Sequence, residues 1–285
     1  MEKILLLGSN GFIGRNLESY FSNRENTMLL SPKRGDLNLL DEASCRDFLK
    51  KEKPNKIVYS AVNLTSLDDT LRMFFNIYQN REYYGFLYNI GSGAEYDKRS
   101  YIPLMKEDYF GTFVPVDTYG LGKYLISREI ESARGNAINL RVFAIYGKHE
   151  DYSRRFISNN ICRVLGGKPI SINKNIPFDY IHVDDFCHIL DRMMNVTPAF
   201  FNYNVCSGSP VGLLDLGQKI ADQMGVDQIV SPKESGNGAE YSGDNSRLID
   251  EIGRVEYKPV QIGIDELINW YRKCDSDGQL NYESL

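Results

Sequence analysis

Short runs of apolar residues recur along the first half of the chain, and amphipathic segments separate them. The runs lie at residues 3–7, 27–30, 56–60, 86–90 and 137–143. Segments such as 15–21, 42–52 and 120–133 carry apolar side chains at helical spacing. Short apolar strands that alternate with helices are typical of a parallel sheet buried on both faces. The pattern therefore predicts an α/β fold with a doubly wound parallel sheet.

The pattern changes after about residue 148. Polar, turn-rich stretches lie at 173–177, 207–210 and 231–244, and short strands separate the helical segments 184–194 and 213–224. We expect a smaller, mixed α/β second domain made of residues 149–182 and 207–285. Residues 1–148 and about 183–206 would form the sheet domain. The polar tail from Cys274 to Leu285 is predicted to fray.

A glycine-rich turn, residues 8–14, follows the first apolar run and precedes a helical segment. This order places a helix N-terminus beside the turn, where backbone N–H groups and the helix dipole favour a pyrophosphate. Gly8 suits the tight turn, Gly11 close approach of the backbone, and Gly14 packing of helix on strand. An ordinary turn between strand and helix also needs small residues. The order of elements favours dinucleotide binding, through Gly8, Asn10, Gly11, Phe12, Ile13 and Gly14.

Tyr119 and Lys123 form the most informative pair of polar residues. Their spacing is one helical turn, so the phenol and the ammonium emerge on the same face. A lysine there would stabilise the phenolate and lower the pKa of Tyr119, which makes the tyrosine a usable acid–base group. The same spacing also occurs by chance on solvated helices. Ser92 follows the fourth apolar run, so we expect Ser92, Tyr119 and the glycine turn to converge at one edge of the sheet.

The composition narrows the class of protein. At 285 residues, 42% hydrophobic and 25% charged, the chain can bury a full core. A net charge of −5 offers no basic surface for nucleic acid. The chain enters a strand without a signal peptide and no apolar run approaches membrane-spanning length, so we expect a cytoplasmic protein with no membrane partner. The five cysteines are scattered and the three histidines lack ligand spacing, which predicts reduced thiols and no metal.

Several motifs, in order, resemble those of the extended short-chain dehydrogenase/reductases, which are nucleotide-sugar epimerases, dehydratases and reductases. The resemblance runs from Met1 to about Arg272 and implies a Rossmann-like dinucleotide-binding domain with a substrate domain. It rests on Gly8, Gly11, Gly14, Asp36-Leu37, Ser92, Tyr119, Lys123, residues 179–185 and Gly243-Asp244-Asn245-Ser246. The stretch from Arg34 to Asp41 resembles the corresponding part of GDP-fucose synthases, which reduce a 4-keto sugar with NADPH.

The resemblance implies roles for these residues. Ser92 would hydrogen-bond the substrate oxygen, Tyr119 would give up its proton, and Lys123 would bind the nicotinamide ribose. A hydroxyl that satisfies a strand-end backbone group is the alternative for Ser92. The other cofactor contacts implied by the resemblance are Ala61 at the ribose, Asp36 and Leu37 at the adenine, and Phe143 and Ile145 beside the nicotinamide.

The residues after the second apolar run bear on the choice of cofactor. NAD-specific folds place a carboxylate there, on the ribose 2′-hydroxyl. Here the sequence is Ser31-Pro32-Lys33-Arg34, and its two cations could meet a 2′-phosphate through charge-assisted hydrogen bonds. A solvated basic turn is the alternative. We therefore predict NADPH (as NADP in its oxidised form), with NAD as the second choice.

Two departures from the family pattern bear on the reaction. GDP-fucose synthases carry a cysteine two residues after the serine and a histidine beyond the Tyr-Gly turn, whereas this chain has Ala94 and only the early His149. We expect ketone reduction without epimerisation of the neighbouring carbons. Many relatives have an arginine that grips the substrate diphosphate where this chain has Phe178. The candidates for substrate binding are Ser92, Arg154, Arg155, Asn160 and Arg247.

The sequence thus predicts NADPH-dependent reduction of a keto group, at C4 of a 6-deoxy sugar on a nucleoside diphosphate, in the synthesis of deoxysugar or surface-polysaccharide precursors. An NAD-dependent nucleotide-sugar 4-epimerase is the alternative enzyme. A dinucleotide-sensing regulator is the alternative of another class, although such regulators typically lose the active tyrosine. A homodimer is expected. His182 and His188 lie at a strand-to-helix transition and are interpreted as structural.

Overall fold

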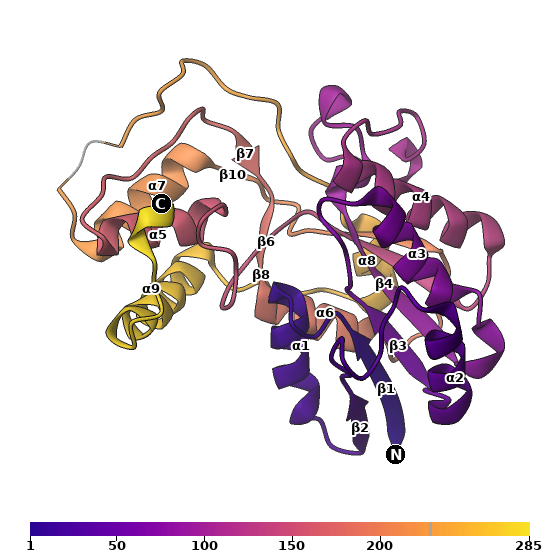
Figure 1. Cartoon of the computed structure of the whole chain (residues 1–285). Coiled ribbons are helices and arrows are strands. Elements are labelled where there is room, and N and C mark those ends of the chain that lie inside the picture. The colour runs from indigo at the N-terminus through magenta and orange to yellow at the C-terminus, as the bar shows by residue number, and fades with distance from the viewer. Residues whose placement is uncertain (228–229) are drawn as a thin grey trace.

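The apolar runs form strands of one large sheet (Figure 1). The computed structural model describes residues 1–227 and 230–285. The strands of the sheet are β1 (Glu2–Leu7), β2 (Thr27–Leu30), β3 (Lys56–Tyr59), β4 (Phe86–Ser92), β5 (Ala137–Val142) and β9 (Asn202–Val205). In the described residues they lie in the order β2-β1-β3-β4-β5-β9, and every neighbouring pair is parallel. The predicted doubly wound parallel sheet is confirmed.

Helices cover both faces of this sheet because its strands are apolar on both sides. Ile4 and Leu6 of β1 belong to the core on one face, and Leu5 and Leu7 to the core on the other. The first core includes residues of α1 (Phe12–Ser22), α6 (Val183–Met193) and α8 (Ser246–Ile252). The second includes residues of α2 (Glu42–Glu52), α3 (Leu67–Tyr78) and α4 (Thr118–Ala133).

Local interactions set the ends of these helices. At the start of α4 the Asp117 carboxylate accepts a hydrogen bond of 2.8 Å from the Gly120 N–H. The helix ends where Arg134 adopts the left-handed conformation, with φ 46°. The connecting loops contain the short helices η1 (Arg81–Tyr83), η2 (Gly93–Glu95), η3 (Lys98–Ser100), η4 (Glu107–Tyr109) and, near the C-terminus, η5 (Tyr282–Ser284).

A third core lies beside the large sheet. It is built from apolar residues of α5 (Phe156–Leu165), α7 (Leu213–Met224) and α9 (Val260–Ser276), which gather on one side of Figure 1. Two small strand pairs lie outside the large sheet. One joins β6 (Ala144–Tyr146) with β8 (Tyr180–His182), and the other joins β7 (Pro177–Phe178) with β10 (Val211–Gly212). None of the described helices combines the length and the apolar character needed to cross a bilayer.

Two sequence-based expectations differ from the structure. The range 207–285 was assigned to the second domain, but Leu248 and Ile252 of α8 pack in the sheet core. The tail was expected to fray, but Lys168 Nζ donates hydrogen bonds to the carbonyl oxygens of Tyr282 (2.6 Å) and Leu285 (3.0 Å). In both cases the difference arises from contacts between residues far apart in the sequence, which the composition of a local segment cannot predict.

Candidate active site

The carboxyl ends of the central strands bring the predicted site residues to one edge of the sheet. The glycine turn follows β1, Ala61 follows β3, and Ser92 is the last residue of β4. After β1 the chain adds β2 on one side of that strand, and it then crosses over to add β3 on the other side. Such a switch point leaves a crevice outside the strand ends, where open α/β sheets bind ligands.

A cavity of about 540 Å³ occupies this crevice. Gly8, Asn10, Gly11, Arg34, Leu37 and Ala61 are among its lining residues. Gly8 has φ +88°, and a Cβ on Gly14 would lie 2.1 Å from the Gly8 carbonyl oxygen, so the turn requires glycine at both positions. No side chain in the described residues caps the start of α1, which leaves its N–H groups to an external anion. The lining therefore fits the adenosine and pyrophosphate part of a dinucleotide.

The two predicted cations differ in their surroundings. Lys33 Nζ lies 3.1 Å from Ser9 Oγ and 3.1 Å from Glu18 Oε1, so a carboxylate already balances its charge. Arg34 lines the cavity and is in no ion pair within residues 1–227 and 230–285. Asp36 is absent from the cavity lining and accepts a hydrogen bond of 3.0 Å from the Lys33 N–H. The Asp36 carboxylate thus shapes the turn that presents Arg34.

Lys123 and Tyr119 project from the first two turns of α4. Lys123 is buried, and its Nζ donates a hydrogen bond of 2.6 Å to the Ile90 carbonyl oxygen. Burial lowers the pKa of Lys123 to about 8, although the negative charge of Glu95 acts to raise it. Burial raises the pKa of Tyr119, while the neighbouring Ser92 hydroxyl and the Arg155 charge lower it. We expected the pKa of Tyr119 to be lowered by Lys123. In the structure this pKa is raised, because desolvation of the phenol is the largest effect.

Ser92 caps the short helix η2 that follows β4. Its Oγ accepts a hydrogen bond of 3.2 Å from the Ala94 N–H, as a cap of η2. The same hydroxyl lowers the pKa of both Tyr119 and Tyr241. The Ser92 hydroxyl thus satisfies a backbone N–H group and influences the Tyr119 phenol.

A buried ion pair lies directly beneath Ser92. Arg141 Nε donates to Glu95 Oε2 at 2.8 Å, and both side chains are 0% exposed. Glu95 Oε1 accepts a hydrogen bond of 2.8 Å from the Ser92 N–H. Asn139 Nδ2 also donates to Glu95, and the Arg141 guanidinium donates to the Ser127 hydroxyl of α4. This network joins β4, β5 and α4, and the sequence analysis missed it.

The predicted substrate residues fall into two groups. Arg155 is exposed at the start of α5, and its charge lowers the pKa of both Tyr119 and Tyr180. Arg154 is also exposed, beside Asp151 at 3.8 Å. Phe178 lies in an aromatic group with Tyr180 and Tyr241.

The side chains of Asn160 and Arg247 form hydrogen bonds or ion pairs with other groups of the protein. The Asn160 side chain is 1% exposed, and it accepts from the Ser171 N–H at 2.8 Å. Arg247 donates to Asn202 Oδ1 and pairs with Asp108 at 2.9 Å. Asn202 begins β9, so Arg247 lies at the amino end of the sheet, opposite the crevice. Both side chains are thus engaged with groups of the protein itself.

Phe143, Ile145 and His149 follow β5. Phe143 is buried, with its ring 5.1 Å from that of Tyr241, and Ile145 packs against the sheet core. His149 lies against Trp270, with ring centroids 4.9 Å apart, and lines a second cavity of about 600 Å³ beside α1. This cavity and the one at the glycine turn share no lining residue.

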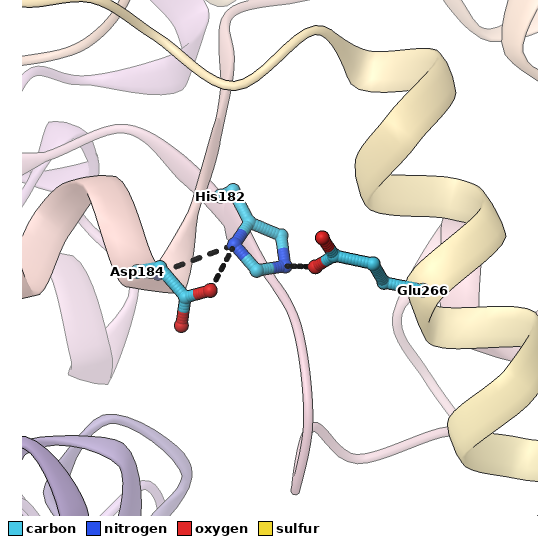
Figure 2. A group of neighbouring side chains, drawn as sticks. All are labelled: His182, Asp184 and Glu266. Carbon is cyan, nitrogen blue, oxygen red and sulfur yellow. Dashed lines mark hydrogen bonds and ion pairs between the residues drawn. The ribbon is translucent and has the colours of Figure 1, made fainter.

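His182, Asp184 and Glu266 converge where β8, α6 and α9 meet (Figure 2). One ligand atom from each lies within 4.8 Å of the others. The Lys258 ammonium lies 2.8 Å from Asp184 Oδ2 and 2.6 Å from Glu266 Oε2, so a cation of the protein itself bridges the carboxylates. We interpret this group as an ion-pair network that holds α9 against α6, and His188, which contacts the Tyr20 hydroxyl at 3.2 Å, as structural.

Residues 4–206 match the NAD dependent epimerase/dehydratase family, and the chain belongs to this family. The family resemblance drawn from the motifs is thereby confirmed. A curated relative, an uncharacterized 37.6 kDa protein in the cld 5′ region of Escherichia coli O111:H-, is 27% identical over 158 residues. That match covers 48% of this chain and 47% of the relative, so the chain spans about half the length of that relative.

Solved structures share the fold over nearly the whole chain. A UDP-glucose 4-epimerase from Thermotoga maritima, in complex with UDP-glucose, has a TM-score of 0.80 at 19% identity, covering 95% of this chain and 99% of the other. A GDP-L-fucose synthetase from Naegleria fowleri, bound to NADP, has a TM-score of 0.84 at 13% identity, covering 98% and 96%. Likeness at such identities establishes the fold and leaves the reaction to the site itself.

The Glu95→Gln substitution should destabilise the protein by about 3 kcal/mol, because it leaves the buried Arg141 without its carboxylate partner. Urea unfolding measures this loss. Glu42→Gln, at an exposed residue in a pair with Arg46 on α2, is the matched control and should cost at most about 0.5 kcal/mol. Equal small losses in both variants would contradict a structural role for the buried pair.

The Glu150→Gln substitution should change how stability depends on pH. Burial raises the pKa of Glu150 to about 8, although its Oε2 accepts a 2.5 Å hydrogen bond from Ser158. Between its unfolded value of 4.5 and 8, the folded protein holds a proton that the unfolded chain releases, so stability falls as pH rises. The slope is about 1.4 kcal/mol per pH unit, and Glu150→Gln should lose it.

Urea unfolding at several pH values between 5 and 9 measures this difference. Glu42→Gln serves again as the control and should retain the wild-type slope. Parallel profiles for wild type and Glu150→Gln would mean that Glu150 ionises at the same pH in the folded and unfolded states.

Proposed function

We propose that the protein uses NADPH to reduce the C4 keto group of a 6-deoxy-4-keto sugar on a nucleoside diphosphate. Such a reaction would supply precursors of deoxysugars or surface polysaccharides. The observation that carries the proposal is that Ser92, Tyr119 and Lys123 lie toward the carboxyl edge of the sheet that also holds the cavity at the glycine turn. Membership of the NAD dependent epimerase/dehydratase family supports it.

The protein's own groups suit protonation of a ketone oxygen. Bound NADPH would supply the hydride for the carbonyl carbon. Burial raises the pKa of Tyr119 and so keeps its phenol protonated at neutral pH, ready to donate to the developing alkoxide. The Ser92 hydroxyl donates a hydrogen bond to the same oxygen. Lys123, one helical turn along α4, stabilises the phenolate that remains and binds the nicotinamide ribose.

The substrate diphosphate is held by Arg155 in this proposal. Arg155 is exposed and close enough to Tyr119 and Tyr180 to lower the pKa of both phenols. Its guanidinium can bind a phosphate through paired N–H donors. Arg154 is the second candidate, weakened by its neighbour Asp151. The aromatic ring of Phe178 offers packing to the substrate in place of charge.

Epimerisation of the carbons beside the ketone needs an acid–base pair within reach of the substrate. Ala94 has no such group, and His149 packs on Trp270 in the cavity beside α1. Both observations favour reduction alone. The GDP-L-fucose synthetase with NADP is a neighbour in fold and supports this cofactor, whereas the UDP-glucose 4-epimerase supports the alternative of an NAD-dependent 4-epimerase. The retained Ser92, Tyr119 and Lys123 argue against a regulator without catalysis.

Tyr119→Phe should retain NADPH binding and lose about 10²–10⁴-fold in kcat, because only the acidic proton is removed. The assay follows NADPH absorbance with 4-keto-6-deoxy sugars on GDP, CDP, dTDP and UDP. Tyr109→Phe, whose hydroxyl donates to the Ser100 carbonyl oxygen, is a matched control and should retain turnover. A Tyr119→Phe enzyme with wild-type kcat would refute the mechanism. Wild-type inactivity on every ketone would refute the substrate class.

The double substitution Lys33→Ala with Arg34→Ala should weaken NADPH binding far more than NADH binding, because a charge-assisted contact to phosphate contributes roughly 1.5–3 kcal/mol. Arg34→Ala alone should have the larger single effect, since Glu18 already balances Lys33. Fluorescence titration with both cofactors measures this, with the exposed Arg46→Ala as control. If the wild-type protein binds NADH more tightly than NADPH, the NAD-dependent 4-epimerase becomes the better-supported function.

A further inference from the structure

The adjacent cations Lys33 and Arg34 differ in their relation to the cavity at the glycine turn. Pro32 and Arg34 are among the residues that line this cavity, whereas Lys33, between them, is not. The backbone is fixed here, because the Asp36 N–H donates to the Lys33 carbonyl oxygen at 2.8 Å and the Asp36 carboxylate accepts from the Lys33 N–H at 3.0 Å. Of the two cations that follow β2, only Arg34 therefore borders the cavity.

The side chain of Lys33 is held by Glu18 of α1. Lys33 Nζ lies 3.1 Å from Glu18 Oε1 and 3.3 Å from Glu18 Oε2, so both carboxylate oxygens face the same ammonium. The third partner is Ser9 Oγ of the glycine turn, at 3.1 Å. An ammonium has three N–H donors, and three oxygen atoms lie within hydrogen-bond distance of this one. Lys33 is thus fully engaged by the protein beside the cavity.

This arrangement bears on the 2′-phosphate that distinguishes NADP from NAD. In dinucleotide-binding folds the chain after the second strand meets the adenosine ribose at its 2′ position. The Lys33 ammonium can bind a phosphate there only by giving up the Glu18 carboxylate. That carboxylate, once released, carries the same sign of charge as the phosphate. Glu18 and the 2′-phosphate therefore compete for Lys33, whereas the 2′-hydroxyl of NAD does not need this cation.

We propose that Glu18 is a specificity-determining residue for the cofactor. By pairing with Lys33 it leaves Arg34 as the principal cation for the 2′-phosphate, and it thereby limits the preference for NADPH over NADH. The inference rests on the proposed function, because it concerns the cofactor of the same reaction. Glu18 acts through Lys33, from a helix that follows the glycine turn, and the chain after β2 does not by itself decide the cofactor.

The test is Glu18→Gln in the full-length protein, titrated with NADPH and with NADH by cofactor fluorescence in the absence of any sugar. The variant should bind NADPH about tenfold more tightly, the low end for a charge-assisted hydrogen bond because the Lys33 side chain is 47% exposed. Its affinity for NADH should be unchanged. Glu52→Gln is the matched control: Glu52 pairs with Lys3 at 3.3 Å, at the opposite end of β1 from the glycine turn, and neither affinity should change.

A double-mutant cycle tests whether Glu18 acts through Lys33. In the Lys33→Ala background most of the gain from Glu18→Gln should vanish, and in the Arg34→Ala background it should remain. An unchanged NADPH affinity in Glu18→Gln, an equal gain for NADH, or a full gain in the Lys33→Ala background overturns the proposal. If the expected affinities are found and the wild type reduces no ketone, the proposed reaction is refuted and the role of Glu18 stands. A wild type that binds neither cofactor overturns both.

Discussion

The buried ion pair between Glu95 and Arg141 is the constraint on which the site depends. Burying two charges costs several kcal/mol each unless hydrogen bonds replace the lost water. Here Asn139, Ser127 and the Ser92 N–H supply those bonds. A helix, two strands and the serine loop must therefore all be in place before the charges are satisfied. The geometry of Ser92 follows from this condition and not from the loop's own preferences.

The same burial sets the electrostatics of the catalytic groups. Lys123 of α4 is buried, with its ammonium on the Ile90 carbonyl oxygen, and Glu95 is the carboxylate that offsets part of its desolvation. Tyr119 is desolvated as well, so its phenol stays protonated. The proposed proton transfer would start from this protonated phenol, with Lys123 one helical turn further along α4.

Sequence reasoning reached the parts of the molecule that local patterns determine. The strands were predictable because apolar runs buried on both faces have a distinct pattern, and the glycine turn because Gly8 and Gly14 meet steric limits that other residues cannot. The relation of Tyr119 to Lys123 was predictable from helical spacing. The pair of Glu95 and Arg141 was not, because these residues lie 46 positions apart and nothing local identifies them as partners. The roles assigned to the site residues remain predictions, whereas the fold and the family are established.

The two halves of the site differ for the same reason. The dinucleotide half is made of a strand end, a glycine turn and a helix N-terminus, which are consecutive in the chain and independent of side-chain detail. The proposed substrate half consists of α5, β7 and the segment around Tyr241, which come together only through tertiary packing. Proteins at 13% and 19% identity share the fold of this chain over nearly its whole length. In this chain the part around β7 consists of aromatic rings, with Phe178 and Tyr241 packed against one another, and the role proposed for it in binding a substrate would therefore depend on ring packing as well as on the charge of Arg155.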